Sequence, residues 1–338
     1  MKIDYVFAPT WPSAAAEEAA RAQRLGFDGF FTADTGHEPF LPIAAAAGRV
    51  PDLDFGTAIA VAFARSPMVT AMTAWDLSML ARGRFLLGLG TQIKPHITRR
   101  FSMEWSSPGP RLREYIHAIR AIWNTWQSGA PLRFKGDYYE FTLMTPFFNP
   151  GPSEYGDVPV YIAGVGPYMA RLAGEICDGY HVHPFHTVTY LREVTLPAMQ
   201  AGADGAGRDL ASVERASLVF VVTGRSSAEM DAMRTAVKQQ IAFYASTPAY
   251  RPVLDVHGWD IQETLNAMSK RGEWAAMGDV ITDDMVDEFA VVAPLDELGP
   301  AIKERYDGLL DRVGYYSLGD VMAGISDDTW AELVASTK

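Results

Sequence analysis

The sequence is poor in cysteine, in long hydrophobic runs and in positive charge. Its 338 residues include a single cysteine, Cys177, so no intramolecular disulfide can form, and an intracellular protein is the simpler expectation. No apolar run reaches the length of a membrane span, and the first residues lack the pattern of a signal peptide, which predicts a cytoplasmic protein. With 29 lysines and arginines against 41 acidic residues, the net charge of −12 argues against nucleic acid as a partner.

Several catalytic and organisational signals are missing as well. The sequence has no Gly-x-Ser-x-Gly elbow and no convincing pair of catalytic carboxylates, so hydrolase chemistry has little support. It has no linker rich in Pro, Gly and Ser and no repeat of fixed period. The hydrophobic fraction of 48% is ordinary for a globular protein. We therefore predict a single globular domain over residues 1–338.

Short apolar runs alternate with helical patterns along the chain, which is typical of βαβ units around a parallel sheet. Ser66 followed by Pro67, for example, predicts the start of a helix. Eight strands are expected, at residues 3–8, 27–33, 53–63, 84–90, 158–163, 179–183, 217–223 and 313–317. Insertions follow strands four and seven. The first insertion holds a helix and a hairpin at 134–141. The second holds a helix at 259–270 and an apolar run at 289–292, which would lie outside the barrel. The pattern favours a (β/α)8 barrel over a doubly wound open sheet.

The loops that follow the strands are the place to look for chemistry, because a (β/α)8 barrel carries its active site at the carboxyl ends of its strands. Asp34, His37 and Glu38 follow the second strand within five residues. Such a group could donate or accept a proton, or orient the polar edge of a ligand. Alternatively, Asp34 and Thr35 only cap the helix that follows.

A basic segment follows the fourth strand, which ends in the glycine-rich run from Gly88 to Thr91. Glycines there let the backbone approach a ligand closely. Residues 91–113 hold five basic side chains and one acidic side chain, a charge of +4 against −16 in the rest of the chain. The basic residues are Lys94, Arg99, Arg100, Arg111 and Arg113. This local reversal of charge suggests an anionic ligand, although the arginines could also line a solvated helix face.

The fifth strand leads directly into a helix through Gly164, Val165, Gly166 and Pro167. Free N–H groups at the start of a helix can receive a phosphate. The spacing matches neither the Walker loop nor the dinucleotide fingerprint, so the motif is a weak signal by itself.

His181, His183 and His186 lie around the end of the sixth strand. His181 and His183 share one face of the strand, so the three could in principle bind a metal ion. No carboxylate or cysteine lies nearby in the sequence to complete such a site, and we predict none. Histidines that line a pocket or exchange protons are the favoured interpretation, with ordinary packing as the alternative.

Together these loops resemble the luciferase-like monooxygenase superfamily, and within it the branch that uses the deazaflavin coenzyme F420. The matching segments keep their order and spacing over nearly the whole chain. They are GFDGFFTAD at 26–34, GTAI at 56–59, GRFLLGLGT at 83–91, PVYIAGVGP at 159–167 and AGEICDG at 173–179. The resemblance implies a (β/α)8 barrel with the ring of the coenzyme at the carboxyl ends of the strands.

The resemblance also implies how the coenzyme is held. A non-prolyl cis peptide would fall between Ala58 and Ile59 and support the ring, and Asp34 would hydrogen-bond the coenzyme. Gly90 and Thr91 would lie against the ring. The phosphate would lie near Gly164, Val165, Gly166 and Pro167, which agrees with the helix-start argument above. Proteins of this family are often dimers, so we expect a homodimer.

The basic segment bears on the choice between F420 and FMN. F420 carries a phosphate and an oligoglutamate tail, whereas FMN carries one phosphate. The positive side chains from Lys94 to Arg100 therefore favour F420.

One position departs from the family. Many F420-dependent relatives have an acid followed directly by His at the end of strand two, and that His transfers a proton at the ring. Here Thr35 follows Asp34, so either His37, His183 or His186 is the proton partner or the protein protonates its substrate in another way. Candidates for an aromatic pocket wall, with core packing as the alternative, are Trp11, Phe40, Phe101, Trp105 and Phe148.

These expectations combine into one function with two alternatives. The predicted function is an F420-dependent oxidoreductase that transfers a hydride between deazaflavin C5 and a small organic substrate. The alternatives are an FMN-dependent luciferase-like monooxygenase and a non-catalytic protein that binds flavin or deazaflavin.

Overall fold

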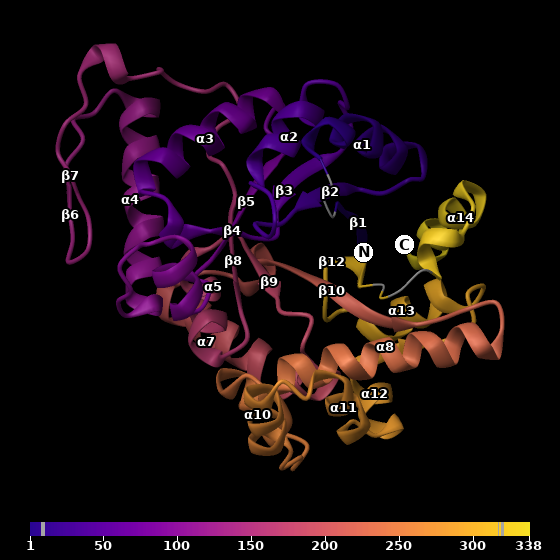
Figure 1. The fold of residues 1–338 in the computed structure, drawn as a ribbon. Helices are drawn as coiled ribbons and strands as arrows, with labels where there is room; N and C mark the ends of the chain where they lie inside the picture. The colour runs from indigo at the N-terminus through magenta and orange to yellow at the C-terminus, as the bar shows by residue number, and fades with distance from the viewer. Residues whose placement is uncertain (8–10, 317, 319–320) are drawn as a thin grey trace. The chain divides into compact units, whose positions relative to one another are not determined.

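The computed structural model describes residues 1–7, 11–316, 318 and 321–338. They form two compact units, each described by itself below (Figure 1). The N-terminal unit consists of Phe7–Gln23 and Gly29–Ala163, and the C-terminal unit consists of Met1–Val6, Arg24–Asp28 and Gly164–Lys338. None of the described helices combines the length and the apolar character that a membrane span requires.

Four parallel strands form the sheet of the N-terminal unit. They are β2 (Gly29–Thr32), β3 (Asp54–Thr57), β5 (Phe85–Gly90) and β8 (Val160–Gly164, whose last residue belongs to the C-terminal unit). β2 pairs with β3, β3 with β5 and β5 with β8; Gly29 lies opposite Asp54, and Leu87 opposite Val160. Every residue of β2 and β5 is buried, as expected of strands that are covered on both faces.

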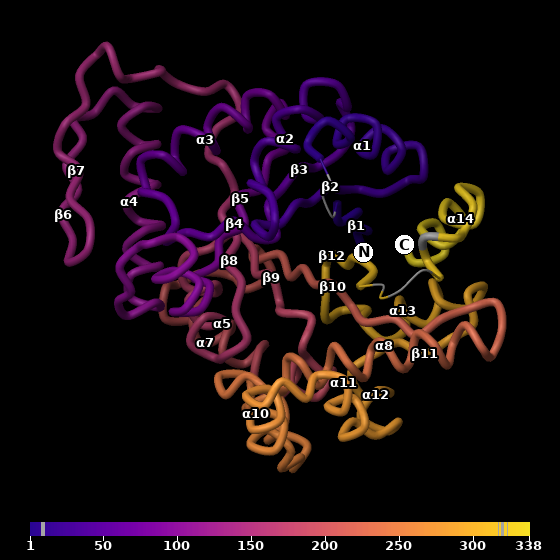
Figure 2. The backbone as a smooth tube through the Cα atoms, in the orientation of Figure 1, coloured from indigo at the N-terminus to yellow at the C-terminus, as the bar shows by residue number. Residues whose placement is uncertain are grey.

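The helices of this unit alternate with its strands along the chain. They are α1 (Ala15–Arg24), α2 (Phe40–Ala47), α3 (Pro67–Leu80) and α4 (Pro108–Ser128). Ser66 caps α3 as predicted, because its hydroxyl accepts a hydrogen bond from the N–H of Val69 at 3.2 Å. The predicted hairpin is also present, as β6 (Phe134–Lys135) and β7 (Glu140–Phe141). It lies beside α4 (Figures 1 and 2), where the carboxylate of Glu114 accepts hydrogen bonds from the N–H groups of Tyr138 and Tyr139.

The sheet of the C-terminal unit is centred on β10 (Glu214–Val222). Its other strands are β1 (Lys2–Phe7), β9 (Gly179–Val182), β12 (Arg312–Tyr316) and the short β11 (Ala290–Val292). β10 pairs with β9 and β12, and β12 pairs with β1, all in parallel. β11 pairs with the far end of β10, where Phe220 lies opposite Ala290.

Among the described residues, the C-terminal unit has ten helices. They are α5 (Pro167–Ile176), α6 (Val188–Tyr190), α7 (Leu196–Ala206), α8 (Ser227–Ala245), α9 (Arg251–Asp255), α10 (Gln262–Arg271), α11 (Trp274–Met277), α12 (Asp283–Phe289), α13 (Leu298–Tyr306) and α14 (Asp327–Thr337). The helices from α9 to α12 belong to the second predicted insertion. The helix predicted at 259–270 begins three residues later, at Gln262.

The order of strands and helices is that of a (β/α)8 barrel, so the predicted fold class is confirmed. Each unit contributes four of the eight strands, and β11 is additional to them, as predicted for the apolar run at 289–292. Two predicted strand ends, Ala8 and Ser317, lie outside the described residues.

The third strand was predicted at 53–63, and the prediction is wrong in its extent. β3 ends at Thr57, the peptide bond between Ala58 and Ile59 is cis as the resemblance implies, and the short β4 (Ala60–Val61) follows. A 3-10 turn then spans Ala62–Ala64. An apolar run indicates that a segment is buried, but it does not indicate where the backbone leaves the strand.

Candidate active site

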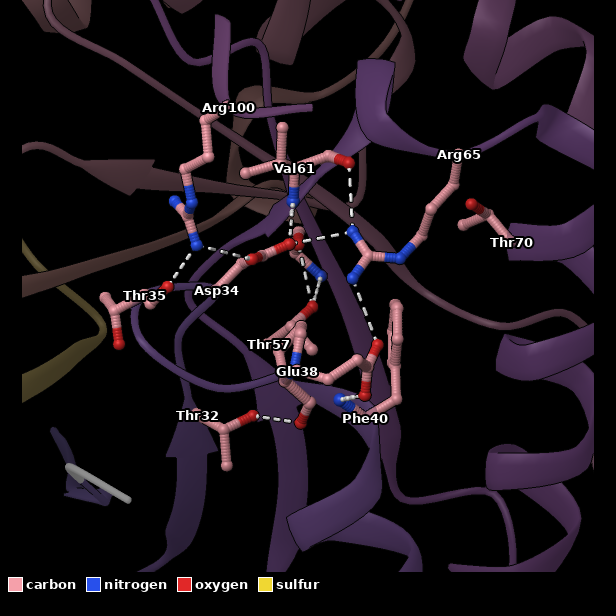
Figure 3. Close-up of polar contacts among 12 residues, drawn as sticks. Thr32, Asp34, Thr35, Glu38, Phe40, Thr57, Val61, Arg65, Thr70 and Arg100 are labelled. Carbon is pink, nitrogen blue, oxygen red and sulfur yellow. Dashed lines mark hydrogen bonds and ion pairs between the residues drawn. The ribbon is translucent and has the colours of Figure 1, made fainter. Parts of the chain in front are cut away.

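Asp34 lies in a network of charged side chains just beyond β2 (Figure 3). Its carboxylate is only 4% exposed, and its Oδ2 accepts hydrogen bonds from Arg65 Nη1 at 2.7 Å and from the N–H of Val61 at 3.2 Å. The second oxygen, Oδ1, lies 3.9 Å from Arg100 Nη2. Asp34 is therefore an acceptor whose Oδ2 is already occupied, and Oδ1 is its less constrained oxygen.

Glu38 completes this network from the start of α2. Arg65 Nη2 donates to its Oε1 at 3.0 Å. Its Oε2 accepts from the N–H groups of Phe40 at 2.8 Å and of Leu41 at 3.0 Å, two donors that the first turn of a helix leaves without a backbone partner. Arg65 thus links two carboxylates of the loop between β2 and α2. The sequence pattern gives no sign of this role for Arg65.

Backbone contacts bring the segments after β2, β3 and β5 together. The N–H of Asp34 donates to the carbonyl of Ile59 at 2.9 Å, and the N–H of Ala58 donates to that of Thr32 at 2.7 Å. A side chain at Gly90 would meet Ile59, because an added Cβ would lie 2.6 Å from Ile59 Cδ1. Four of the predicted coenzyme-binding residues, Asp34, Ala58, Ile59 and Gly90, are therefore neighbours.

His37 lies in the same loop and is partly exposed. Its ring centre lies 5.8 Å from that of Trp11, with the planes tilted by 51°. No other described residue hydrogen-bonds its imidazole, so both ring nitrogens are available to a ligand or to water.

Two arginines of the basic segment after β5 are held by neighbouring groups of the N-terminal unit. Arg100 donates to the carbonyl of Thr35, and its guanidinium lies 4.7 Å from the Phe101 ring. Arg111 donates to Tyr139 Oη at 2.9 Å and lies 4.6 Å above the ring of Phe63.

Two cations of this segment are differently placed. Lys94 and Arg99 are exposed and form no ion pair with the described part of the chain, and they remain available to an anion. Thr91, which precedes them, is partly exposed and donates to the carbonyl of Gln92.

The predicted phosphate loop lies in the C-terminal unit, between β8 and α5. Gly166 is the N-cap residue of α5, with φ −82°, and no side chain caps the helix. An added Cβ at Gly164 would lie 2.4 Å from Met169 Cβ, so packing requires this glycine. An added Cβ at Gly166 would meet nothing within 4 Å, so the backbone there is open to a ligand. The loop therefore fits a bound phosphate: its N–H groups are uncapped and its surface is unobstructed.

His183 lies one residue beyond β9. Its Nδ1 accepts a hydrogen bond from the N–H of Phe185 at 3.1 Å, and its Nε2 lies 3.4 Å from Tyr250 Oη. The rings of His183 and Tyr244 pack edge to face, with 4.7 Å between their centres. Burial, and then the charge of His186, lowers the pKa of His183 to about 3. The ring is neutral near neutral pH, and both nitrogens already have partners.

His186 is more deeply buried. Its Nδ1 donates to the carbonyl of His183 at 2.8 Å, and its Nε2 has no hydrogen-bond partner among the described residues. Burial and the charge of Arg305 lower the pKa of His186 to about 4, although the bond to His183 acts in the opposite direction. In the described residues, neither these histidines with His181 nor any other group of three His, Cys, Asp or Glu side chains is arranged to hold a metal ion.

The aromatic candidates for a pocket wall have different surroundings. Phe40 is buried beneath the guanidinium of Arg65, at 5.3 Å, and Trp105 packs edge-on against Phe63 at 6.3 Å. Trp11 and Phe148 are both more than half exposed. Phe40 is therefore accounted for by packing, the alternative considered for each of these residues.

Comparisons with known proteins agree with the fold. The family model for luciferase-like monooxygenases matches residues 8–312. The chain is 48% identical over 306 residues, 90% of each chain, to the uncharacterized protein Rv1360 of Mycobacterium tuberculosis (strain ATCC 25618 / H37Rv).

Two solved structures have the same fold. The coenzyme F420 dependent tetrahydromethanopterin reductase from Methanopyrus kandleri superposes with a TM-score of 0.76 and 20% identity, covering 99% of this chain and 96% of the other. The oxygenating constituent of 3,6-diketocamphane monooxygenase from Pseudomonas putida, in complex with FMN, superposes with a TM-score of 0.68 and 16% identity, covering 99% and 96%.

Proposed function

The chain belongs to the luciferase-like monooxygenase family, and on that premise we propose that it is an F420-dependent oxidoreductase acting on a small organic substrate. When bound, F420 supplies a ring carbon, C5, that exchanges a hydride with the substrate, which no side chain can do. The observation that carries the choice of F420 is the pair of exposed cations, Lys94 and Arg99, that have no counter-ion in the described chain. A coenzyme with several negative charges uses both, whereas FMN carries a single phosphate.

The residues that would hold the coenzyme fall into two groups. Ala58, Ile59, Gly90 and Thr91 would contact the ring. Residues 164–167 would receive the phosphate through uncapped N–H groups. Asp34 would contact the coenzyme through Oδ1, because its Oδ2 is held by Arg65 and Val61.

His37 is the proposed proton partner. When a hydride leaves a carbon that bears O–H or N–H, that group also gives up its proton, and the reverse reaction returns both. A positioned side chain that can accept and return a proton, most often a histidine, speeds such a reaction. His37 is partly exposed and has no hydrogen-bond partner among the described residues, whereas both nitrogens of His183 are engaged and His186 is buried.

A binding titration with oxidised F420 and with FMN, at low and high salt, tests the choice of coenzyme. We expect micromolar binding of F420 that weakens with salt, and much weaker binding of FMN. A preference for FMN contradicts the proposal and supports oxygen chemistry, which oxygen consumption by the reduced protein would then measure.

A pair of glycine variants tests the phosphate loop. Gly166→Ala should leave the free energy of unfolding within about 0.5 kcal/mol, because the new methyl group meets no other atom. It should nevertheless lower F420 affinity by about tenfold or more, because the methyl group occupies the approach of the phosphate. The matched control is Gly205→Ala in α7, which also adds a methyl group in open space and should not change affinity. Equal affinities for the two variants would place the phosphate elsewhere.

His37→Ala distinguishes an enzyme from a protein that only binds the coenzyme. We expect F420 affinity within about twofold of the wild-type value and a loss of turnover of about a hundredfold or more, the usual contribution of a general acid or base. The absence of turnover in the wild-type protein with every alcohol, amine and unsaturated carbonyl substrate tried would instead support the non-catalytic alternative.

We also propose a homodimer, supported by an apolar face of the N-terminal unit. Five apolar side chains there are each about half exposed, which is unusual for a face turned to water. They are Leu41 of α2 and Val69, Met72, Met79 and Leu80 of α3. Sedimentation should show a dimer that Met72→Glu dissociates and that Phe243→Glu, at an equally exposed apolar site of α8, does not. A monomeric wild-type protein contradicts this proposal.

A further inference from the structure

Two buried tyrosines donate hydrogen bonds to successive carbonyls of the loop between β8 and α5. The hydroxyl of Tyr180, in β9, donates to the carbonyl of Gly164 at 2.7 Å. The hydroxyl of Tyr190, in α6, donates to the carbonyl of Val165 at 3.0 Å. Both tyrosine side chains are at most 2% exposed, and the two bonds reach a loop that is itself partly exposed.

These two bonds also determine the direction of two N–H groups. The C=O and N–H of one trans peptide point in opposite directions. A fixed carbonyl at Gly164 therefore fixes the N–H of Val165, and a fixed carbonyl at Val165 fixes the N–H of Gly166. Both carbonyls face the tyrosines, which line one small cavity together with this loop, so both N–H groups face away from it.

The two N–H groups have no partner in the described residues. Hydrogen bonds from Met169 and Ala170 reach the carbonyl of Gly166, but none leaves the N–H of Val165 or Gly166. The space beside Gly166 is open, as the missing contacts of an added Cβ indicate. Two adjacent free donors with one orientation, next to the uncapped start of α5, form a site for an anion with several oxygens.

We propose that Tyr180 and Tyr190 are positioning residues for the coenzyme phosphate: they hold two carbonyls on one side of the loop and so present the N–H groups of Val165 and Gly166 to the phosphate on the other. This inference rests on the proposed function, because it takes the ligand of the loop to be that phosphate.

The tyrosines are themselves held in place. The hydroxyl of Thr187 accepts a hydrogen bond from the N–H of Tyr190 at 3.1 Å and also bonds His257 Nε2 at 2.8 Å. Tyr180 Oη would lie 3.3 Å from a Cβ added at Gly164, so the loop and the hydroxyl fit closely. Burial raises the pKa of both tyrosines, that of Tyr190 to about 12, so both remain protonated donors at neutral pH.

The test compares each coenzyme with its phosphate-free form. Tyr180→Phe, Tyr190→Phe and the double variant are titrated with F420 and with its deazaflavin fragment that keeps the ribityl chain but lacks the phosphate and the tail. The control is Tyr315→Phe, which removes a partly buried hydroxyl bonded to Thr337 at 2.8 Å in the same unit. Thermal unfolding of every variant verifies that the protein is folded.

We expect each single variant to lower F420 affinity by about five- to tenfold, and the double variant by more, consistent with one lost hydrogen bond per hydroxyl. Affinity for the phosphate-free fragment should stay within twofold, and Tyr315→Phe should change neither. If Tyr180→Phe does not fold, Tyr190→Phe carries the same test.

Two results overturn the inference: equal losses for F420 and for the fragment, or no loss for either. A merely structural role predicts the equal losses. Failure of the proposed function looks different, because the wild-type protein itself would then not prefer F420 over the fragment. If the wild type instead binds FMN, the same variants are titrated with FMN and with riboflavin. The affinity loss for FMN is then compared with the loss for riboflavin, which lacks the phosphate.

Discussion

The carboxyl ends of the strands carry opposite chemistry in the two units. In the N-terminal unit, Asp34 is buried as an ion, held by Arg65 at 2.7 Å and approached by Arg100 at 3.9 Å. In the C-terminal unit, the comparable positions hold His183 and His186, which burial keeps uncharged.

The difference shows two ways of keeping polar groups in a site before a ligand arrives. A buried ion depends on its counter-ion, so the loss of one partner leaves a charge without compensation. A buried neutral imidazole needs no counter-ion, but it must remain unprotonated. The first region should therefore be sensitive to substitution, and the second to acid.

The largest effect is expected from Arg65→Met, which breaks the first region. Asp34, whose side chain is only 4% exposed, would lose its 2.7 Å partner and keep only Arg100 at 3.9 Å and the N–H of Val61. The loss of the main partner of a buried charge costs about 3 kcal/mol. Urea unfolding should show a loss of this size. The matched control is Arg251→Met, because Arg251 contacts three carboxylates but is 43% exposed, and its loss should destabilise the protein much less than the loss of Arg65. Similar losses of stability for the two variants would contradict the view that the buried ion pair of Asp34 matters more than an exposed one.

Most of the fold is predictable from the sequence because its signals are local. A buried strand appears as an apolar run, and the cap of α3 consists of two adjacent residues, Ser66 and Pro67. The third strand was mispredicted because the bend after Thr57 lies inside a run that is apolar almost throughout. α14 (Asp327–Thr337) was missed, although its N-cap residue, Ser326, precedes two acidic residues, a signal that could have identified it.

The candidate site was only partly predictable, for a physical reason. Asp34 was identified because it follows a strand directly. Arg65, 31 residues away, pairs with it only through the fold, and no local pattern records such a contact. The same holds for Tyr190, whose hydroxyl reaches Val165 across 25 residues.

Acid should act on the second region, where one unit of pH changes the contribution of one buried histidine by less than the loss expected for Arg65→Met. The folded pKa of His186 is about 4, below the ordinary value of 6.5, so as the pH falls below about 6.5 the unfolded chain binds a proton that the folded chain does not. Stability then falls with decreasing pH, by at most about 1.4 kcal/mol per pH unit for each such histidine, until the folded protein also binds the proton near pH 4.

His186→Gln should remove one histidine's share of this slope between pH 6.5 and 4, as measured by urea unfolding at several pH values. The groups near His186 include Arg305 and Tyr306, both unchanged in the variant. His96→Gln is the control, since His96 is exposed to water in the folded protein, and its slope should match that of the wild type. A wild-type slope in His186→Gln would mean that this imidazole is not kept neutral by burial.

The smallest effect is expected at the rim of the first region, where Lys94 is exposed and unpaired among the described residues. Lys94→Gln should lower F420 affinity by about threefold at low salt, because one exposed charge contributes less than about 1 kcal/mol. The difference should vanish near 0.5 M salt, where screening extends over only a few ångströms. Lys270→Gln, an equally exposed lysine of α10, should have no effect. If both lysines change affinity alike, each acts only by changing the net charge of the whole protein, and the exposed charges of the first region have no local role. If Lys94 alone changes affinity, its contribution should depend on salt, whereas the contribution of the tyrosine-held loop in the second region should not.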